Sequence, residues 1–311
     1  MMPFPDLLRL VKALDGRLPD PTPESDPERL LALHPGLASI DVEDLRIPGP
    51  RGDVPARFYK PEAPARAGFV WIHGGAFIAG DLDGAEANWV SLRLAAGGIA
   101  VLSLDYRKAL GGVHYPVPLD DVAAGWDWAV RNAERFGVPV SSLHLGGASA
   151  GANLAAGLAK RVRDTHGAAR PASLVLAVPL VHARHPDLSD EDLRTMRAGA
   201  PGAIFEPEDI VHMVNNYAGT RSVLADPYAF AANGDLTNQP PMLVLTSEFD
   251  SLRPSGEAYA AAVAAAGGVA KLMMVRGAPH AALVNLESAS GRFSIEAIAD
   301  WILNGSQDPD R

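Results

Sequence analysis

A serine with the surroundings of a catalytic nucleophile lies near the middle of the chain. It is Ser149, at the centre of Gly147-Ala-Ser-Ala-Gly151. The apolar residues Leu143–Gly147 predict a strand before it, and Ala150–Arg163 predict a helix after it. A serine on such a sharp strand-to-helix turn is exposed for attack, and small neighbours allow the strained backbone. The pattern predicts that Ser149 is a nucleophile.

A serine hydroxyl needs a general base, and that base needs an acid that orients it. With a serine of this kind, the expected chain order is serine, then Asp or Glu, then His. Asp250 follows the predicted strand Met242–Ser247, and Glu248 is an alternative acid just before it. His280 follows the predicted strand Lys271–Val275 and is the only histidine after Asp250. We therefore predict that Asp250 orients His280 and that His280 activates the serine.

Backbone N–H groups that face a developing oxyanion are the third requirement of this chemistry. The predicted buried strand Phe69–His73 runs directly into two glycines and an alanine. Small residues leave backbone amides free to approach a substrate. We therefore assign an oxyanion hole to Gly74, Gly75 and Ala76, together with Ala150 after the nucleophile. Within this set Gly75, Ala76 and Ala150 are the expected donors, and the histidine that ends the strand braces the loop.

Predicted strands and helices alternate along the chain from residue 68 onwards. Helices of this length between buried strands imply a mostly parallel sheet with helices on both faces, which is the α/β class. The predicted strands are Ile40–Ile47, Val54–Tyr59, Phe69–His73, Ala100–Asp105, Leu143–Gly147, Leu174–Pro179, Met242–Ser247 and Lys271–Val275. The predicted helices are Glu86–Ala96, Pro118–Phe136, Ala150–Arg163, Gly256–Ala266 and Ser290–Leu303.

Two segments do not fit this alternation. Residues 182–222 are polar, interrupted by proline and partly helical. A structureless loop of that length is improbable in a compact domain, so we predict an inserted helical cap segment there. Residues 1–40 carry a short amphipathic pattern and are predicted to form an N-terminal helical cap segment. The α/β core then consists of residues 41–181 and 223–311.

The composition argues against several classes of partner. The formal net charge of −10 disfavours nucleic acid and anionic membranes. The chain has no cysteine, which excludes disulfides, thiolate catalysis and cysteine-ligated metals. The histidine pair His182 and His185 has no further ligands at metal-site spacing, so we expect no metal. Charged residues and prolines interrupt the N-terminus, and we expect no stable membrane insertion and a cytoplasmic location.

The ordered motifs together resemble the hormone-sensitive-lipase family of bacterial carboxylesterases, which have the α/β-hydrolase fold and a His-Gly-Gly motif before the nucleophile. The matching segments are His73–Phe77, Leu104–Arg107, Tyr115–Asp121, Gly147–Leu154, Asp226–Tyr228, Pro240–Val244, Asp250–Arg253 and His280. The resemblance implies a helical cap, ester substrates with short acyl chains, no cofactor and frequent homodimers.

Three positions depart from the family pattern. Ala76 stands where a third glycine is usual, Ala148 where aspartate is common, and His280 is followed by alanine where glycine is usual. None of these changes removes a reacting group, but each could alter specificity. We therefore expect a serine carboxylesterase that hydrolyses small esters through an acyl-enzyme on Ser149. The alternatives are an amidase, lactonase or acyltransferase on the same triad, or a non-catalytic protein that binds a small ligand.

Overall fold

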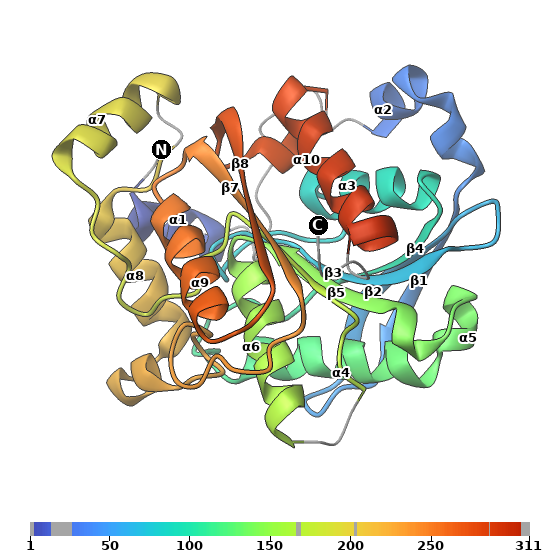
Figure 1. Ribbon diagram of the computed structural model, residues 1–311, viewed down its shortest axis with the longest axis horizontal. Helices are drawn as coiled ribbons and strands as arrows, with labels where there is room; N and C mark the ends of the chain where they lie inside the picture. The colour runs from blue at the N-terminus through green and yellow to red at the C-terminus, as the bar shows by residue number, and fades with distance from the viewer. Residues whose placement is uncertain (1–2, 14–26, 166–168, 202–203, 286, 306–311) are drawn as a thin grey trace.

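The chain folds around one eight-stranded sheet (Figure 1), here described from a computed structural model that covers residues 3–13, 27–165, 169–201, 204–285 and 287–305. The strands are β1 (Asp41–Ile47), β2 (Val54–Lys60), β3 (Ala67–Ile72), β4 (Ile99–Leu104), β5 (Leu143–Ala148), β6 (Leu174–Ala177), β7 (Met242–Phe249) and β8 (Ala270–Pro279). Their order is β1-β2-β4-β3-β5-β6-β7-β8. The pairs β1–β2 and β2–β4 are antiparallel, and the remaining pairs are parallel. The predicted α/β class with a mostly parallel sheet is confirmed.

The core has two layers, one on each face of the sheet. Successive side chains of a buried strand point to opposite faces and so enter different layers. In β3, Val70 and Ile72 belong to one apolar cluster, whereas Phe69 and Trp71 belong to the other. All four residues are completely buried. The sheet centre is therefore covered on both faces, as its continuous apolar strands require.

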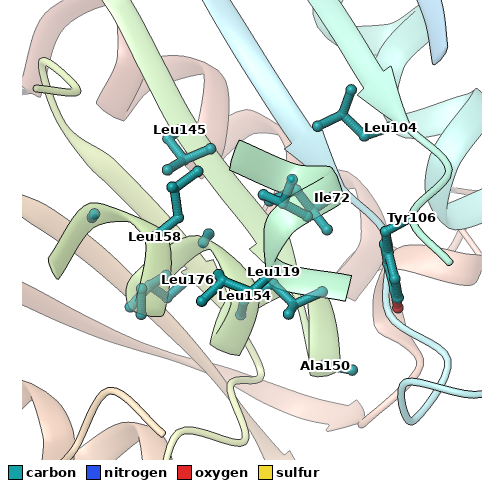
Figure 2. Packing of buried hydrophobic residues seen from close by; sticks show 14 of the residues in the cluster. Ile72, Leu104, Tyr106, Leu119, Leu145, Ala150, Leu154, Leu158 and Leu176 are labelled. Carbon is teal, nitrogen blue, oxygen red and sulfur yellow. The ribbon is translucent and has the colours of Figure 1, made fainter. Parts of the chain in front are cut away.

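The helices of the chain lie on both sides of this sheet. Their bounds are α1 (Phe4–Ala13), α2 (Pro27–Leu33), α3 (Ala85–Ala96), α4 (Val117–Arg131), α5 (Ala133–Phe136), α6 (Ala150–Thr165), α7 (Asp190–Gly199), α8 (Pro207–Ala218), α9 (Arg253–Ala265) and α10 (Ala289–Asp300). Helices α4, α6 and α9 pack on one face, and α3 and α10 pack on the other (Figure 1). Figure 2 shows Leu154 and Leu158 of α6 among Leu145 of β5 and Leu176 of β6.

The sequence predicts one helix over Pro118–Phe136, but the structure has two. The break between α4 and α5 lies at Asn132. The side-chain amide of Asn132 donates a hydrogen bond of 2.8 Å to the carbonyl oxygen of Trp128. Asparagine side chains compete in this way with the regular backbone bonds of a helix. The chain then leaves α5 at Gly137, which has a left-handed φ of 71°.

The segment between β6 and β7 contains α7 and α8, which lie together at one side of the molecule (Figure 1). Helix α1 packs against α8. The backbone N–H of Phe4 donates a hydrogen bond of 2.7 Å to Asp209 at the start of α8. The N-terminal helix and the inserted segment are therefore in direct contact. Among the described residues, no helix has the length and apolar character needed to cross a membrane.

Candidate active site

The predicted site residues meet at one edge of the sheet. Ser149 follows β5, Asp250 follows β7 and His280 follows β8. The loop Gly74–Ala76 follows β3. These four strands are parallel, so their carboxyl ends lie at the same edge, which is where ligand sites form in open α/β sheets.

The turn at Ser149 is tight because the strand, the helix and β3 approach one another closely. Ser149 has a φ of 53°, in the left-handed region that non-glycine residues rarely adopt. A Cβ atom on Gly151 would lie 2.1 Å from the carbonyl oxygen of Ile72, and one on Gly147 would lie 2.6 Å from the same atom. The two glycines of the motif are thus required by the close approach of β3. The N–H of Ser149 donates to the carbonyl of Ala177 at 2.8 Å, which anchors the turn to β6.

A continuous chain of hydrogen bonds joins the three polar side chains. The distance from Ser149 Oγ to His280 Nε2 is 3.0 Å, and the distance from His280 Nδ1 to Asp250 Oδ2 is 2.9 Å. The carboxylate accepts a hydrogen bond from the Nδ1–H group, so Nε2 of the neutral ring carries the lone pair that can take the serine proton. Ser149 is only 6% exposed and Asp250 is completely buried. This arrangement can activate a hydroxyl for attack on a carbonyl carbon.

The acid that faces His280 is Asp250 rather than the alternative Glu248. Asp250 Oδ1 also accepts a hydrogen bond of 2.9 Å from the backbone N–H of Leu252, so both carboxylate oxygens of Asp250 have partners. Glu248 instead accepts the backbone N–H of Gly277 at 2.7 Å. The geometry therefore separates two acids that the sequence left open.

The charges around His280 favour its protonated form. Burial alone would lower the pKa of His280, but the charge and hydrogen bond of Asp250 and the charge of Glu86 raise it above the ordinary value of 6.5. Glu86 lies at the start of α3, which packs on the opposite face of the sheet from α6. Two carboxylates therefore stabilise the imidazolium that forms when His280 takes a proton.

The loop after β3 contains two backbone N–H groups that donate no hydrogen bond to any described residue. Gly75 has a φ of 101° and Ala76 a φ of 52°. Within the described part of the chain, the N–H groups of Gly75, Ala76 and Ala150 have no hydrogen-bond partner. These three groups are free to bind a ligand oxygen. Gly74 differs, because its N–H donates a hydrogen bond to the carboxylate of Glu86. This bond holds the loop in place, so the N–H of Gly74 is not a free donor.

The carbonyl group of Gly74 is held by two further side chains. The hydroxyl of Tyr106 donates to it at 2.9 Å, and His73 Nδ1 lies 2.8 Å from the same oxygen. The two rings stack with their centroids 4.8 Å apart. The bracing role predicted for His73, which directly follows β3, thus has a direct geometric basis.

Three residues near the site were not assigned a site role from the sequence. Glu86 and Tyr106 hold Gly74, and Phe205 places its ring edge-on to His280 with centroids 5.2 Å apart. Tyr106 lies in a motif that supports the family resemblance, which was an available signal. Glu86 and Phe205 carry no local signal, since only the packing of α3 and of the inserted segment brings them to the sheet edge.

The histidine pair of the inserted segment has other contacts. His182 Nδ1 lies 2.9 Å from Ser255 Oγ, and His185 Nδ1 lies 2.7 Å from the carbonyl oxygen of Pro186. Among the residues that the structure describes, no three or more His, Asp or Glu side chains lie together in a group that could hold a metal ion. Burial lowers the pKa of His182 to about 4, so its ring is neutral.

Comparison with known proteins places this geometry in a family. Residues 69–284 match the model of an alpha/beta hydrolase fold family. The chain is 34% identical to the carboxylic ester hydrolase LipN of Mycobacterium tuberculosis over 250 residues, a match that covers 78% of this chain but 64% of LipN. It is 30% identical to the ethyl acetate hydrolase of Pseudomonas putida over 247 residues, which covers 77% of this chain and 74% of that protein.

Solved structures agree with the sequence relatives. An esterase from the bacterial hormone-sensitive lipase family superposes with a TM-score of 0.72 at 25% identity, covering 97% of this chain and 98% of that chain. The chain therefore belongs to the alpha/beta hydrolase fold family, in the group that includes the esterases of the bacterial hormone-sensitive lipase family.

Proposed function

We propose that this protein is a serine carboxylesterase that hydrolyses small esters with short acyl chains through an acyl-enzyme on Ser149. The observation that carries the proposal is the unbroken hydrogen-bond chain from Ser149 Oγ through His280 to Asp250, with distances of 3.0 and 2.9 Å. The names of LipN and of the ethyl acetate hydrolase support ester bonds as the target. The short acyl group is supported by the second of these names.

Acylation begins when Ser149 Oγ attacks the ester carbonyl carbon and His280 Nε2 takes the hydroxyl proton. The carbonyl electron pair moves onto oxygen, and the oxyanion accepts hydrogen bonds from the free N–H groups of Gly75, Ala76 and Ala150. The tetrahedral intermediate then collapses. His280 returns its proton to the departing alcohol, and the acyl group remains on the serine as an ester.

Deacylation repeats these steps with water as the nucleophile. His280 takes a proton from water, and the resulting hydroxide attacks the acyl carbon of the acyl-enzyme. The same N–H groups stabilise the second oxyanion. When this intermediate collapses, the proton on His280 returns to Ser149 and the carboxylic acid leaves. Asp250 orients the ring throughout, because its carboxylate accepts a hydrogen bond from the Nδ1–H group of His280.

The test is hydrolysis of a panel of p-nitrophenyl esters that differ in acyl length, with an amide and a lactone included. We expect the fastest turnover on the shortest acyl chains. Ser149→Ala should reduce kcat by a factor on the order of 10⁶. Ser141→Ala is the matched control, because Ser141 is exposed on the turn before β5 and should leave kcat unchanged.

Either of two results would contradict the proposal. Near-normal ester hydrolysis by Ser149→Ala would exclude this serine as the nucleophile. Faster turnover of the amide or the lactone than of every ester would assign the same triad to a different reaction.

A further inference from the structure

We infer that Lys108 is a positioning residue that fixes the tautomer of His73 and, through it, the direction of the oxyanion-binding N–H of Gly75. The inference rests on the proposed function, since it concerns the same oxyanion hole. Lys108 lies in the segment after β4 and does not contact the reacting atoms. Its ammonium reaches the far side of the His73 ring, where Nζ lies 3.2 Å from Nε2.

The partners of His73 allow only one neutral tautomer. Nδ1 lies 2.8 Å from the carbonyl oxygen of Gly74, which can only accept, so Nδ1 must carry a proton. Nε2 faces the ammonium of Lys108, which can only donate, so Nε2 must carry a lone pair. Each ring nitrogen is therefore assigned by the chemistry of its partner. His73 is 2% exposed, and bulk water competes little for either nitrogen.

Lys108 is itself held in one position. Its three ammonium protons have three acceptors, namely Asp105 Oδ1 at 2.6 Å, the carbonyl of Tyr106 at 2.8 Å and His73 Nε2 at 3.2 Å. The ammonium also lies 4.2 Å from the centroid of the Tyr106 ring. Only 11% of the lysine side chain is exposed. The group is thus a fixed donor rather than a mobile surface charge.

The bond from His73 reaches the oxyanion hole through a single peptide unit. The carbonyl of Gly74 and the N–H of Gly75 belong to the same planar trans peptide, so they point in opposite directions. Fixing the carbonyl with His73 and Tyr106 therefore fixes the direction of the Gly75 N–H. An oxyanion donor contributes to catalysis only when it is aimed at the developing charge.

Without the Lys108 ammonium, His73 Nε2 would have a different polar neighbour. Asp105 Oδ1 lies 3.7 Å from His73 Nε2, and Lys108 bridges the two atoms. Without the lysine, this carboxylate is the nearest polar partner, and a carboxylate only accepts hydrogen bonds. A proton would then be drawn to Nε2. A neutral ring carries only one N–H proton, so a ring protonated at Nε2 has no proton at Nδ1. The carbonyl of Gly74 then loses one of its two side-chain donors.

The test combines ring-nitrogen NMR with kinetics of the full-length protein. In ¹⁵N spectra of the wild type, we expect His73 to carry its proton on Nδ1 alone, with its signals assigned by their absence in His73→Asn. In Lys108→Met, Nε2 should become protonated. The value of kcat per titrated active site should fall about ten-fold, less than the ~10²–10³ lost with a whole donor. KM should change by less than about two-fold.

Lys160→Met is the matched control, because Lys160 is also a buried lysine, 1% exposed, whose ammonium donates to the carbonyls of Ala231 and Asn233. It should leave the His73 spectrum and kcat unchanged. A wild-type His73 with a proton on Nε2 would overturn the inference, as would an unchanged tautomer or kcat in Lys108→Met. The NMR assignment does not depend on turnover, so absent esterase activity would contradict the proposed function and not the tautomer.

Discussion

At the scale of single residues, two carboxylates act on one imidazole, that of His280. Asp250 is hydrogen-bonded to His280 and completely buried, so its effect on the ring is direct. Glu86 affects His280 through its charge and binds the neighbouring oxyanion loop through the N–H of Gly74. Together they outweigh burial, which on its own would favour the neutral ring. The His280 ring therefore holds its proton to a higher pH than an ordinary histidine, because its pKa is raised.

The effect of Glu86 can be measured in the pH profile of kcat/KM. In the proposed mechanism His280 must be neutral to take the serine proton, so we expect activity to be lost as the pH falls through its raised pKa. Glu86→Gln removes the negative charge and keeps an oxygen that can accept the N–H of Gly74. We expect the acidic limb to move to lower pH. Glu296→Gln, an exposed position on α10, should not move it.

A limb that stayed in place in Glu86→Gln would contradict this assignment. A limb that moved to higher pH would mean that Glu86 lowers the pKa of His280 instead of raising it. An unmoved limb would leave Asp250 as the carboxylate that raises the pKa of His280 against the effect of burial.

The chain order of polar residues predicts Ser149, Asp250 and His280 as a set, because each follows a strand that the sequence pattern indicates. Glu86 could not be predicted in this way. Its carboxylate reaches Gly74 only because α3 packs back over the end of β3, and that contact depends on tertiary packing. The choice between Asp250 and Glu248 has the same limit, since both lie at the end of β7 and only the direction of each side chain separates them.

At the scale of elements, the turn between β5 and α6 depends on how closely β3 approaches it. The carbonyl oxygen of Ile72 lies where a Cβ on Gly151 or Gly147 would be. The contact is with backbone, which cannot rotate away as a long side chain can. The glycines that the motif requires are therefore needed for packing as well as for the strained φ of Ser149.

Gly151→Ala should consequently destabilise the whole protein. Its Cβ would lie 2.1 Å from the oxygen of Ile72, and the overlap can be relieved only by moving β3 or α6. We expect the free energy of unfolding in urea to fall by about 3 kcal/mol. Gly36→Ala is the control, since nothing lies within 4 Å of its added Cβ and stability should change little. Equal stabilities for the two variants would contradict the close approach.

At the scale of the whole molecule, the inserted segment is attached to the rest of the chain unevenly. Ile210, Met213 and Tyr217 of α8 belong to the same buried cluster as the sheet residues Leu102 and Leu145. Helix α7 belongs to a small separate cluster built on Met196, which contacts the sheet at Phe249. The two helices of one segment thus differ in how much apolar surface ties them to the core.

Hydrogen exchange measured by mass spectrometry should reveal this difference under native conditions. Peptides from α8 should exchange as slowly as peptides from β5, because opening α8 disrupts the main core. Peptides from α7 should exchange earlier, since the small cluster of α7 can open without disturbing that core. Earlier exchange of α8 than of α7 would contradict the packing described here.

The most direct test of the central claim is covalent labelling of the nucleophile. An activated alkyl phosphonate should react once per chain at Ser149, because the adduct mimics the tetrahedral intermediate that we propose the N–H groups of Gly75, Ala76 and Ala150 stabilise. Peptide mass mapping is expected to place the adduct on the peptide that contains residues 147–151. Ser149→Ala should take up no label. A stoichiometric adduct on another residue, or a folded wild-type protein that remains unlabelled, would contradict the account.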